Sequence, residues 1–301
     1  MGGKMTKLLT LAAGIVAALA LMVGPAGAIT GNFVEDNTHT YVGLVAFYDA
    51  DGVFMWRCSG SLITPTTFLT AGHCTDQDAA ESPVSARIWF HQNVGGAFNP
   101  PSVPEDPNTG YPNRCLAGDP LCVESTKLFD YGFDNFAGFP NNHDTGLVIL
   151  DHPMTNVGFG KLARPGTLDT LLTQRGLQNT VFTPSGYGVS YTNPTRTVSF
   201  RERLMAETIL VNLNSANTGG FNLQLSSAPA NGRGGTCFGD SGGPVHWGGF
   251  SSTTIVGVNS FVLNNNCAGV GFAYRVDSAA VQDWIKSIIG ASEFAKIQFA
   301  N

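Results

Sequence analysis

The chain has 301 residues, of which 13% are charged, and its formal net charge at neutral pH is −6. This length fits one large domain or two small ones. With 37 glycines and 43% hydrophobic residues, the composition suits a folded, turn-rich protein and excludes a disordered chain or a long helical assembly. The basic residues are scattered, so we expect neither nucleic acid nor an anionic membrane surface as a partner.

The N-terminus has the pattern of a secretory signal peptide. Two lysines precede an apolar run over Leu8–Val23, and the small residues Ala26-Gly27-Ala28 follow. An uncleaved membrane anchor is the alternative, but the run is short for a span of about 20 residues. We therefore expect cleavage after Ala28, which leaves a formal charge of −8. The product would be secreted and monomeric, with no membrane contact.

Most of the remaining chain consists of short apolar or β-branched runs between turn residues. These runs are Tyr41–Tyr48, Ser61–Thr70, Arg87–His91, Gly146–Leu150, Thr208–Leu213, Thr254–Val262 and Gly271–Val276. The pattern predicts an all-β barrel or sandwich and disfavours a doubly wound α/β domain, because no long amphipathic helices alternate with the strands.

Two segments depart from this pattern. Residues 93–142 are rich in Pro, Gly, Asn and Asp, which indicates a long surface loop or insertion. Near the end of the chain, Ser278–Ile289 places Val281, Trp284, Ile285 and Ile288 on one face, which predicts a packing helix that ends at Gly290.

Six cysteines follow the signal segment: Cys58, Cys74, Cys115, Cys122, Cys237 and Cys267. An even number in a secreted chain predicts three disulfides, and the cysteine count alone leaves about 15 pairings open. The spacings typical of a zinc site are absent from the sequence, so we expect no metal and no cofactor.

Three short motifs carry residues suited to nucleophilic catalysis. A serine hydroxyl needs a base to remove its proton, an acid to orient that base, and donors for the oxyanion. Gly239–Pro244 surrounds Ser241 with three glycines, Thr70–Cys74 contains His73, and Asn142–Leu150 contains Asp144 at the start of an apolar run.

Together these motifs resemble the chymotrypsin-like (trypsin-like) serine protease family. The resemblance rests on the motifs TAGHC, HDTGLVIL and CFGDSGGP, which follow the family's order of His, Asp and Ser. It covers nearly all of the mature chain. It implies His73 as general base, Asp144 as its orienting acid and Ser241 as nucleophile. The amides of Gly239 and Ser241 would form the oxyanion hole, and activity would fall below about pH 6.5, where an ordinary histidine becomes charged.

The resemblance also implies an all-β fold of two packed six-stranded antiparallel β-barrels with a C-terminal α-helix. The halves would span residues 29–160, with the insertion at about 93–142, and residues 161–290, followed by a tail over 291–301. The segment between the His and the Asp is longer than family members usually have.

Disulfides and activation follow from the same resemblance. Cys58 would pair with Cys74 and Cys237 with Cys267, which leaves Cys115 and Cys122 to each other. Ile29-Thr30-Gly31-Asn32 is similar to the family's mature N-terminus, whose free amine pairs with the Asp before the nucleophile, here Asp240. We therefore expect signal-peptide removal itself to create the activating terminus, whereas an ordinary signal-peptide junction is the alternative.

The substrate pocket implied by the resemblance lacks a buried charge. Gly235 stands where trypsin-like members carry an Asp, and the neighbouring Thr236 is also uncharged, so a cationic substrate residue would find no partner. The strand with Ser260 and Val262 would pair with an extended substrate, and Gly271 lies opposite. We expect cleavage of proteins or peptides after small or medium apolar residues.

Two other functions remain open. An α/β-hydrolase esterase would also satisfy G-x-S-x-G at Gly239–Gly243, but it requires the order Ser, Asp, His, and the only later histidine is His246. A catalytically silent binding module on the same fold is the second alternative. Such modules usually lose one triad residue, and all three positions are filled here.

Overall fold

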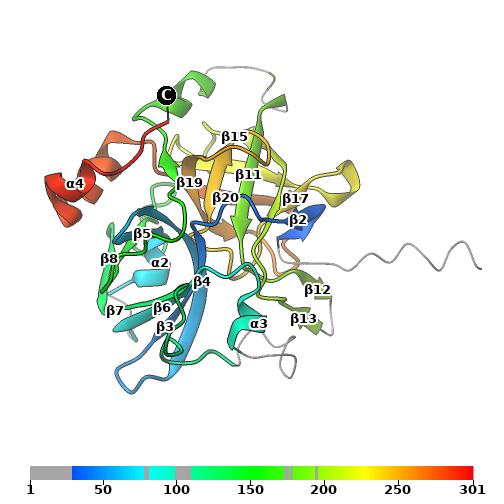
Figure 1. The fold of residues 1–301 in the computed structure, drawn as a ribbon. Helices are drawn as coiled ribbons and strands as arrows, with labels where there is room; N and C mark the ends of the chain where they lie inside the picture. The colour runs from blue at the N-terminus through cyan, green and yellow to red at the C-terminus, as the bar shows by residue number, and fades with distance from the viewer. Residues whose placement is uncertain are drawn as a thin grey trace, which may run out of the picture.

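The computed structural model describes residues 29–77, 81–98, 110–172, 176, 179–193 and 196–300. The expected signal segment, residues 1–28, lies outside them. Two β-rich halves lie side by side, with the long helix α4 (Ala279–Phe294) at the periphery (Figure 1). Within the described part of the chain, no helix is both long and apolar enough to cross a membrane.

The first half is an antiparallel sheet that curls into a half-barrel. In the described residues its strand order is β7-β6-β3-β4-β5-β9-β8. The strands are β3 (Val42–Tyr48), β4 (Phe54–Thr64), β5 (Thr67–Thr70), β6 (Ser85–Trp89), β7 (Cys122–Ser125), β8 (Lys127–Asp130) and β9 (Gly146–Ile149). Every residue of β3 is buried, so this strand forms the centre of the larger hydrophobic core.

One predicted strand proved to be two. The run Ser61–Thr70 was expected to be a single strand, but β4 ends at Thr64 and β5 begins at Thr67, and the two pair as a hairpin. Pro65 lies in the connecting turn, because proline has no N–H to donate to a strand ladder. The prediction was wrong because both sides of the turn are apolar and the run reads as continuous.

The second half is a closed barrel. Six strands form a hydrogen-bonded ring in the order β11-β18-β19-β20-β16-β15 and back to β11. They are β11 (Val181–Gly186), β15 (Thr208–Asn212), β16 (Asn222–Ser227), β18 (Pro244–Trp247), β19 (Thr254–Val262) and β20 (Gly269–Arg275). The expected all-β fold of two packed barrels is confirmed, and this second barrel is the one that closes completely.

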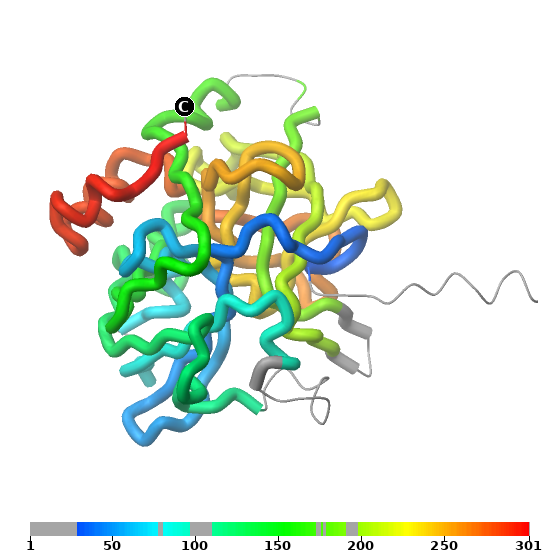
Figure 2. Tube along the Cα trace, in the orientation of Figure 1, coloured from blue at the N-terminus to red at the C-terminus, as the bar shows by residue number. Residues whose placement is uncertain are grey.

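Shorter elements complete the second half. Strand β10 (Lys161–Leu162) pairs in parallel with β19, and β14 (Leu204–Ala206) joins β11 to β2 (Phe33–Glu35). The N-terminal segment therefore lies against the second half before the chain enters the first (Figure 2). The other elements are β1 (Thr30–Gly31), β12 (Tyr191–Asn193), β13 (Arg196–Val198), β17 (Gly234–Gly235), α2 (Gly72–Thr75), α3 (Val94–Phe98), η1 (Thr167–Leu171) and η3 (Pro229–Asn231).

The segment 93–142 is more than a surface loop. It contributes α3 and the two strands β7 and β8 to the first half. A disulfide between Cys115 and Cys122 closes the turn that leads into β7, with the Cα atoms 5.6 Å apart. The sequence predicted an irregular insertion because both strands are only four residues long and lie among turn-forming residues.

Helix α4 packs against the first half, although it follows the second in sequence. Ser278 caps it by accepting a hydrogen bond from the Val281 amide at 3.2 Å. Val281 and Ile285 are buried in the large core, as the predicted helical face requires. The helix was expected to end at Gly290, and the backbone there is indeed non-helical, with φ 79° and ψ 160°. A second short helical segment follows this break and runs to Phe294.

A buried polar cluster joins the N-terminal segment to the second barrel. Both oxygens of Asp36 accept hydrogen bonds, including one from His39 Nδ1 at 2.8 Å and one from Ser185 Oγ at 2.6 Å. The ring of His39 stacks on His246 at 4.1 Å, and the backbone of Asp36 accepts from Arg203 Nε. Burial and the neighbouring charge of His39 lower the pKa of His246 to about 3.

Candidate active site

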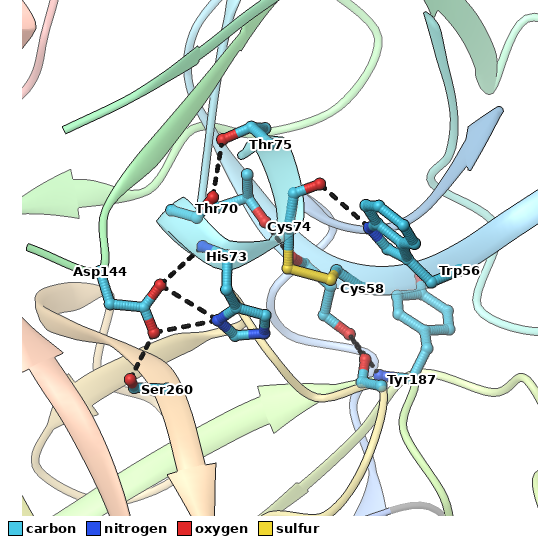
Figure 3. The surroundings of a disulfide bond; sticks show 12 residues. Trp56, Cys58, Thr70, His73, Cys74, Thr75, Asp144, Tyr187 and Ser260 are labelled. Atoms are coloured by element: carbon cyan, nitrogen blue, oxygen red, sulfur yellow. Dashed lines mark hydrogen bonds and ion pairs between the residues drawn. A yellow bond between two sulfur atoms is a disulfide. The ribbon is translucent and has the colours of Figure 1, made fainter. Parts of the chain in front are cut away.

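His73 lies in the short helix α2, which follows β5. The disulfide between Cys58 of β4 and Cys74 ties this helix to the sheet, and Trp56 Nε1 donates to the Cys74 carbonyl at 3.1 Å (Figure 3). The imidazole remains 28% exposed, so it is anchored on one side and open on the other.

Asp144 meets His73 from the loop before β9. Its buried carboxylate accepts from the His73 backbone amide at 2.8 Å, and both of its oxygens lie 3.0 Å from His73 Nδ1. Ser260, in β19 of the other half, donates to the second oxygen (Figure 3). Because the carboxylate can only accept, Nδ1 carries the hydrogen and Nε2 is left with its lone pair available to act as a base.

A glycine permits this close approach. A Cβ at Gly146 would lie 2.4 Å from Thr75 Oγ1 and 2.5 Å from the Ala71 carbonyl oxygen. Any larger residue would therefore push α2 away from β9 and separate the imidazole from the carboxylate.

The surroundings raise the pKa of His73. Burial lowers it, but the negative charge and hydrogen bonds of Asp144 more than offset this effect, so the pKa lies above its ordinary value. The pKa of Asp144 is lowered: burial raises it, but the interaction with His73 and the hydrogen bond from Ser260 outweigh that cost. The pair is therefore arranged to stabilise an imidazolium on His73.

Ser241 lies in a tight loop that packs onto the first half. The Ser59 amide donates to the Ser241 carbonyl at 2.8 Å. Gly242 has φ +77°, and a Cβ there would lie 2.1 Å from Thr70 Oγ1, so only glycine fits. The motif around Ser241 is thus pressed against the strand that leads to His73.

His73 and Ser241 line the same cleft, which has a volume of about 340 Å³. No hydrogen bond joins Ser241 Oγ to the imidazole, although both side chains belong to the described part of the chain. Hydrogen bonds between nucleophile and base are often long before substrate binds. The structure thus brings together two of the three predicted side chains at one opening and holds the third behind the imidazole.

The predicted oxyanion-hole residues lie in a fixed loop. The carbonyl of Phe238 accepts a hydrogen bond from the Val189 amide at 2.7 Å. In a trans peptide the N–H and the carbonyl point in opposite directions, so the Gly239 N–H faces away from Val189. Gly239 has φ +92°, a conformation that favours glycine.

Asp240 is fully buried behind the nucleophile. One carboxylate oxygen accepts from the Gly188 amide at 2.7 Å, and the other accepts from the Cys237 amide at 2.9 Å. Burial raises the pKa of Asp240 to about 7, while these two amides and the charge of Arg57 oppose the increase. Among the described residues, no cationic side chain forms an ion pair with this carboxylate.

The predicted pocket residues line two cavities that share Thr236. Ser260 and Val262 lie on the cleft of His73 and Ser241. Gly235 and Gly271 line a second cavity of only about 10 Å³. A Cβ at Gly235 would lie 2.0 Å from Ser227 Oγ, so no larger residue fits at this position. A Cβ at Gly271 would lie 2.9 Å from Thr236 Oγ1 and 3.8 Å from Val262. Ser260, assigned to the pocket wall, also bonds to Asp144, a role that the motifs alone did not indicate.

An aromatic wall beside the cleft was missed by the sequence analysis. Phe133 lies 5.8 Å from the His73 ring, Phe136 contacts Phe133 edge-on, and Phe261 contacts Phe136 at 5.2 Å. Phe136 and Phe139 are each 38% exposed. The spacing of three phenylalanines at every third position in 133–139 was the available signal, but the segment was interpreted as polar loop.

The cysteines pair as expected, and they leave no metal site around His73. Cys237 and Cys267 form the third disulfide, with their Cα atoms 5.3 Å apart. Ligand-type atoms of Cys58, His73 and Cys74 lie within 4.8 Å of one another. However, the two sulfurs are bonded to each other and offer no thiolate to a metal.

The family model of trypsin matches residues 127–285, which is more than half of the chain. The chain belongs to the trypsin family of chymotrypsin-like serine proteases. The match includes Asp144 and Ser241, whereas His73 lies before the matched residues.

Individual proteins support the same assignment at low identity. Brachyurin of Leptuca pugilator is 28% identical over 241 residues, covering 78% of this chain and 89% of its own. Chymotrypsin-like elastase family member 3A of Homo sapiens is 26% identical over 257 residues, covering 81% and 82%.

Two solved structures share the fold of this trypsin-family chain. HL collagenase superposes with a TM-score of 0.59 at 21% identity, over 86% of this chain and 96% of its own. Human heparin binding protein superposes with a TM-score of 0.54 at 18% identity, over 85% and 94%.

The raised pKa of His73 can be measured directly. We expect its imidazole to titrate above 6.5 in NMR spectra, because Asp144 stabilises the charged form. Asp144→Asn should lower this pKa, since the amide carries no charge. His152→Gln, which removes an exposed histidine, identifies an unrelated resonance and serves as the control. A His73 pKa below 6.5 in the unmodified protein would contradict the described pairing.

Proposed function

We propose that this chain is a secreted serine endopeptidase in which His73, Asp144 and Ser241 form the catalytic triad. The observation that carries this proposal is the orientation of the His73 imidazole. Asp144 binds Nδ1 with both oxygens, and the opposite edge of the ring faces the cleft that Ser241 also lines. Secretion follows from the predicted signal peptide, and the two halves at 29–160 and 161–290 are the proposed domains.

The reaction proceeds in two steps. Ser241 Oγ attacks the scissile carbonyl carbon while His73 Nε2 takes its proton, and Asp144 stabilises the resulting imidazolium. The oxyanion accepts from the amides of Gly239 and Ser241. The tetrahedral intermediate collapses, and His73 returns the proton to the leaving amine. Water then attacks the acyl-enzyme by the same proton transfers and regenerates Ser241.

The nucleophile can be tested by substitution. Ser241→Ala should reduce kcat for peptide hydrolysis by about 10⁶-fold, because no other group can form the acyl-enzyme. Ser251→Ala, at an exposed position in the same half, is the matched control and should retain full activity and labelling by a serine-reactive phosphonate. An unmodified protein that cleaves no peptide in a broad library and takes no phosphonate would support the silent binding module instead.

The proposed preference is for small or medium apolar residues before the cleaved bond. The cavity that Gly235 and Gly271 line has a volume of only about 10 Å³, which is too small for a long side chain, and Val262 pairs across from Gly271. The exposed rings of Phe136 and Phe139 offer apolar surface to neighbouring substrate residues.

The width of this pocket can be changed at one residue. Val262→Gly should raise kcat/KM for a phenylalanine substrate relative to an alanine substrate by about tenfold, because it removes apolar bulk from the wall. Val211→Gly, on an exposed strand position, controls for the loss of a valine elsewhere. Equal ratios in the Val262 variant and the unmodified protein would contradict the assigned pocket.

For activation, we infer that signal-peptide removal exposes the Ile29 amine, which then pairs with Asp240. Ile29 is fully buried against Leu204 and Ala206, and Thr30 pairs with Gly235, five residues before Asp240. A free amine near this carboxylate would favour its charged form, which burial alone disfavours.

N-terminal sequencing of the secreted protein tests the activation step. The mature chain should start at Ile29, and activity should fall at alkaline pH as the amine loses its proton, whose ordinary pKa is about 7.7–8.0. A chain produced with one extra alanine before Ile29 should be weakly active, because its amine cannot occupy the same position. Any other natural start contradicts the hypothesis.

A further inference from the structure

Arg57 is a buried cation next to residues 238–242, here called the reactive-serine loop, and the sequence motifs gave it no role. It lies in β4 directly before Cys58 and is only 8% exposed. Its guanidinium donates to the Tyr187 carbonyl and to Ser199 Oγ, the latter at 2.8 Å. A buried arginine is costly unless its donors are satisfied, so the burial of Arg57 depends on these two acceptors.

The two acceptors of Arg57 belong to one chain segment of the second half. Tyr187 follows β11, and Ser199 follows β13, at the two ends of the β12–β13 hairpin. Ser199 Oγ also donates to the Gly188 carbonyl at 3.1 Å. The guanidinium therefore fixes the carbonyl of Tyr187 directly and that of Gly188 through Ser199.

The same segment holds the reactive-serine loop through its amides. The Gly188 N–H binds the Asp240 carboxylate, and the Val189 N–H binds the Phe238 carbonyl, both at 2.7 Å. The second bond determines the direction of the Phe238–Gly239 peptide. If that peptide rotated, its carbonyl would replace the Gly239 N–H, and the oxyanion would lose a donor.

The guanidinium also touches this loop. A Cβ at Gly239 would lie 2.9 Å from Arg57 Cζ, so the cation packs directly against the Gly239 backbone. Its positive charge acts on the buried Asp240 next to it. Arg57 therefore contacts the loop on one side and holds the supporting segment on the other.

We propose that Arg57 is a positioning residue for the oxyanion hole: it orients the Phe238–Gly239 peptide through the Tyr187–Val189 segment. It does not touch the reacting atoms. This inference rests on the proposed peptidase function. A purely structural role predicts a different result, in which substitution lowers stability but leaves the chemistry of the folded enzyme unchanged.

The test compares Arg57→Met, Arg57→Lys and Ser199→Ala in the mature enzyme, with concentrations fixed by phosphonate titration of Ser241. We expect Arg57→Met to lower kcat by about 10²-fold, within the range for a lost oxyanion donor. KM should change less than about threefold, because ground-state binding uses other groups. Affinity for a peptide boronate, which mimics the tetrahedral intermediate, should fall in proportion to kcat/KM.

Two milder variants separate the effect of the Arg57 charge from that of its hydrogen bonds. Arg57→Lys keeps the charge but not the paired donors, so its kcat should lie between those of the unmodified enzyme and Arg57→Met. Ser199→Ala removes one acceptor and should reduce kcat less than Arg57→Met does. Ser199→Ala also keeps the proposal testable if Arg57→Met does not fold.

Arg87→Met is the matched control. Arg87 in β6 also donates to backbone carbonyls, those of Asn113 and Ala86. The Arg87→Met variant should therefore be less stable but keep its kcat.

Failure of the Arg57 inference can be distinguished from failure of the proposed peptidase function. If all folded Arg57 and Ser199 variants keep the kcat and boronate affinity of an active unmodified enzyme, the inference is wrong and the peptidase function stands. If the unmodified enzyme itself hydrolyses nothing and binds no phosphonate, both proposals are overturned.

Discussion

The carboxylate of Asp240 has no access to water, and the groups around it must compensate for the hydration that it loses. Two backbone amides bind its oxygens, and the nearby cation of Arg57 favours its charged form. Close approach requires small neighbours: a Cβ at Gly188 would lie 2.4 Å from the carboxyl carbon of Asp240. The reactive-serine loop owes its shape to this arrangement, because Asp240 lies between Gly239 and Ser241 in the chain. The backbone conformation around Ser241 therefore depends on how the carboxylate of Asp240 is bound.

The cleft depends equally on contacts between the two halves. His73 and Asp144 come from the first half, and Ser241 and Ser260 come from the second. Ser260 donates a hydrogen bond to Asp144 across the junction. Ser59 Oγ of β4 accepts a hydrogen bond from the Tyr187 amide and donates one to the Gly239 carbonyl at 2.8 Å. A change in the packing of the halves would therefore alter the distance between His73 and Ser241.

Sequence reasoning predicted the fold class, the disulfide pairing and the positions of His73 and Asp144, because short motifs with strict steric demands carry them. Gly146 and Gly242, for example, tolerate no side chain. It did not predict the hairpin at Pro65, the strands β7 and β8, or the short helical segment after Gly290, since tertiary pairing decides these boundaries. Arg57 and the wall of phenylalanines were missed for a related reason. Their partners, such as Ser199 and Phe261, are distant in sequence, and no local pattern connects them.

The stacked rings of His39 and His246 have a consequence for the environment in which the molecule can persist. His246 is held neutral in the folded state, with its pKa lowered from 6.5 to about 3. The unfolded chain therefore binds one more proton between these values, so acidification through this interval favours unfolding. Below about pH 4, protonation of Asp36, whose folded pKa is about 2, adds to the loss. Acidic surroundings would thus lower the stability of the folded protein through these interior groups, independently of any effect at the cleft.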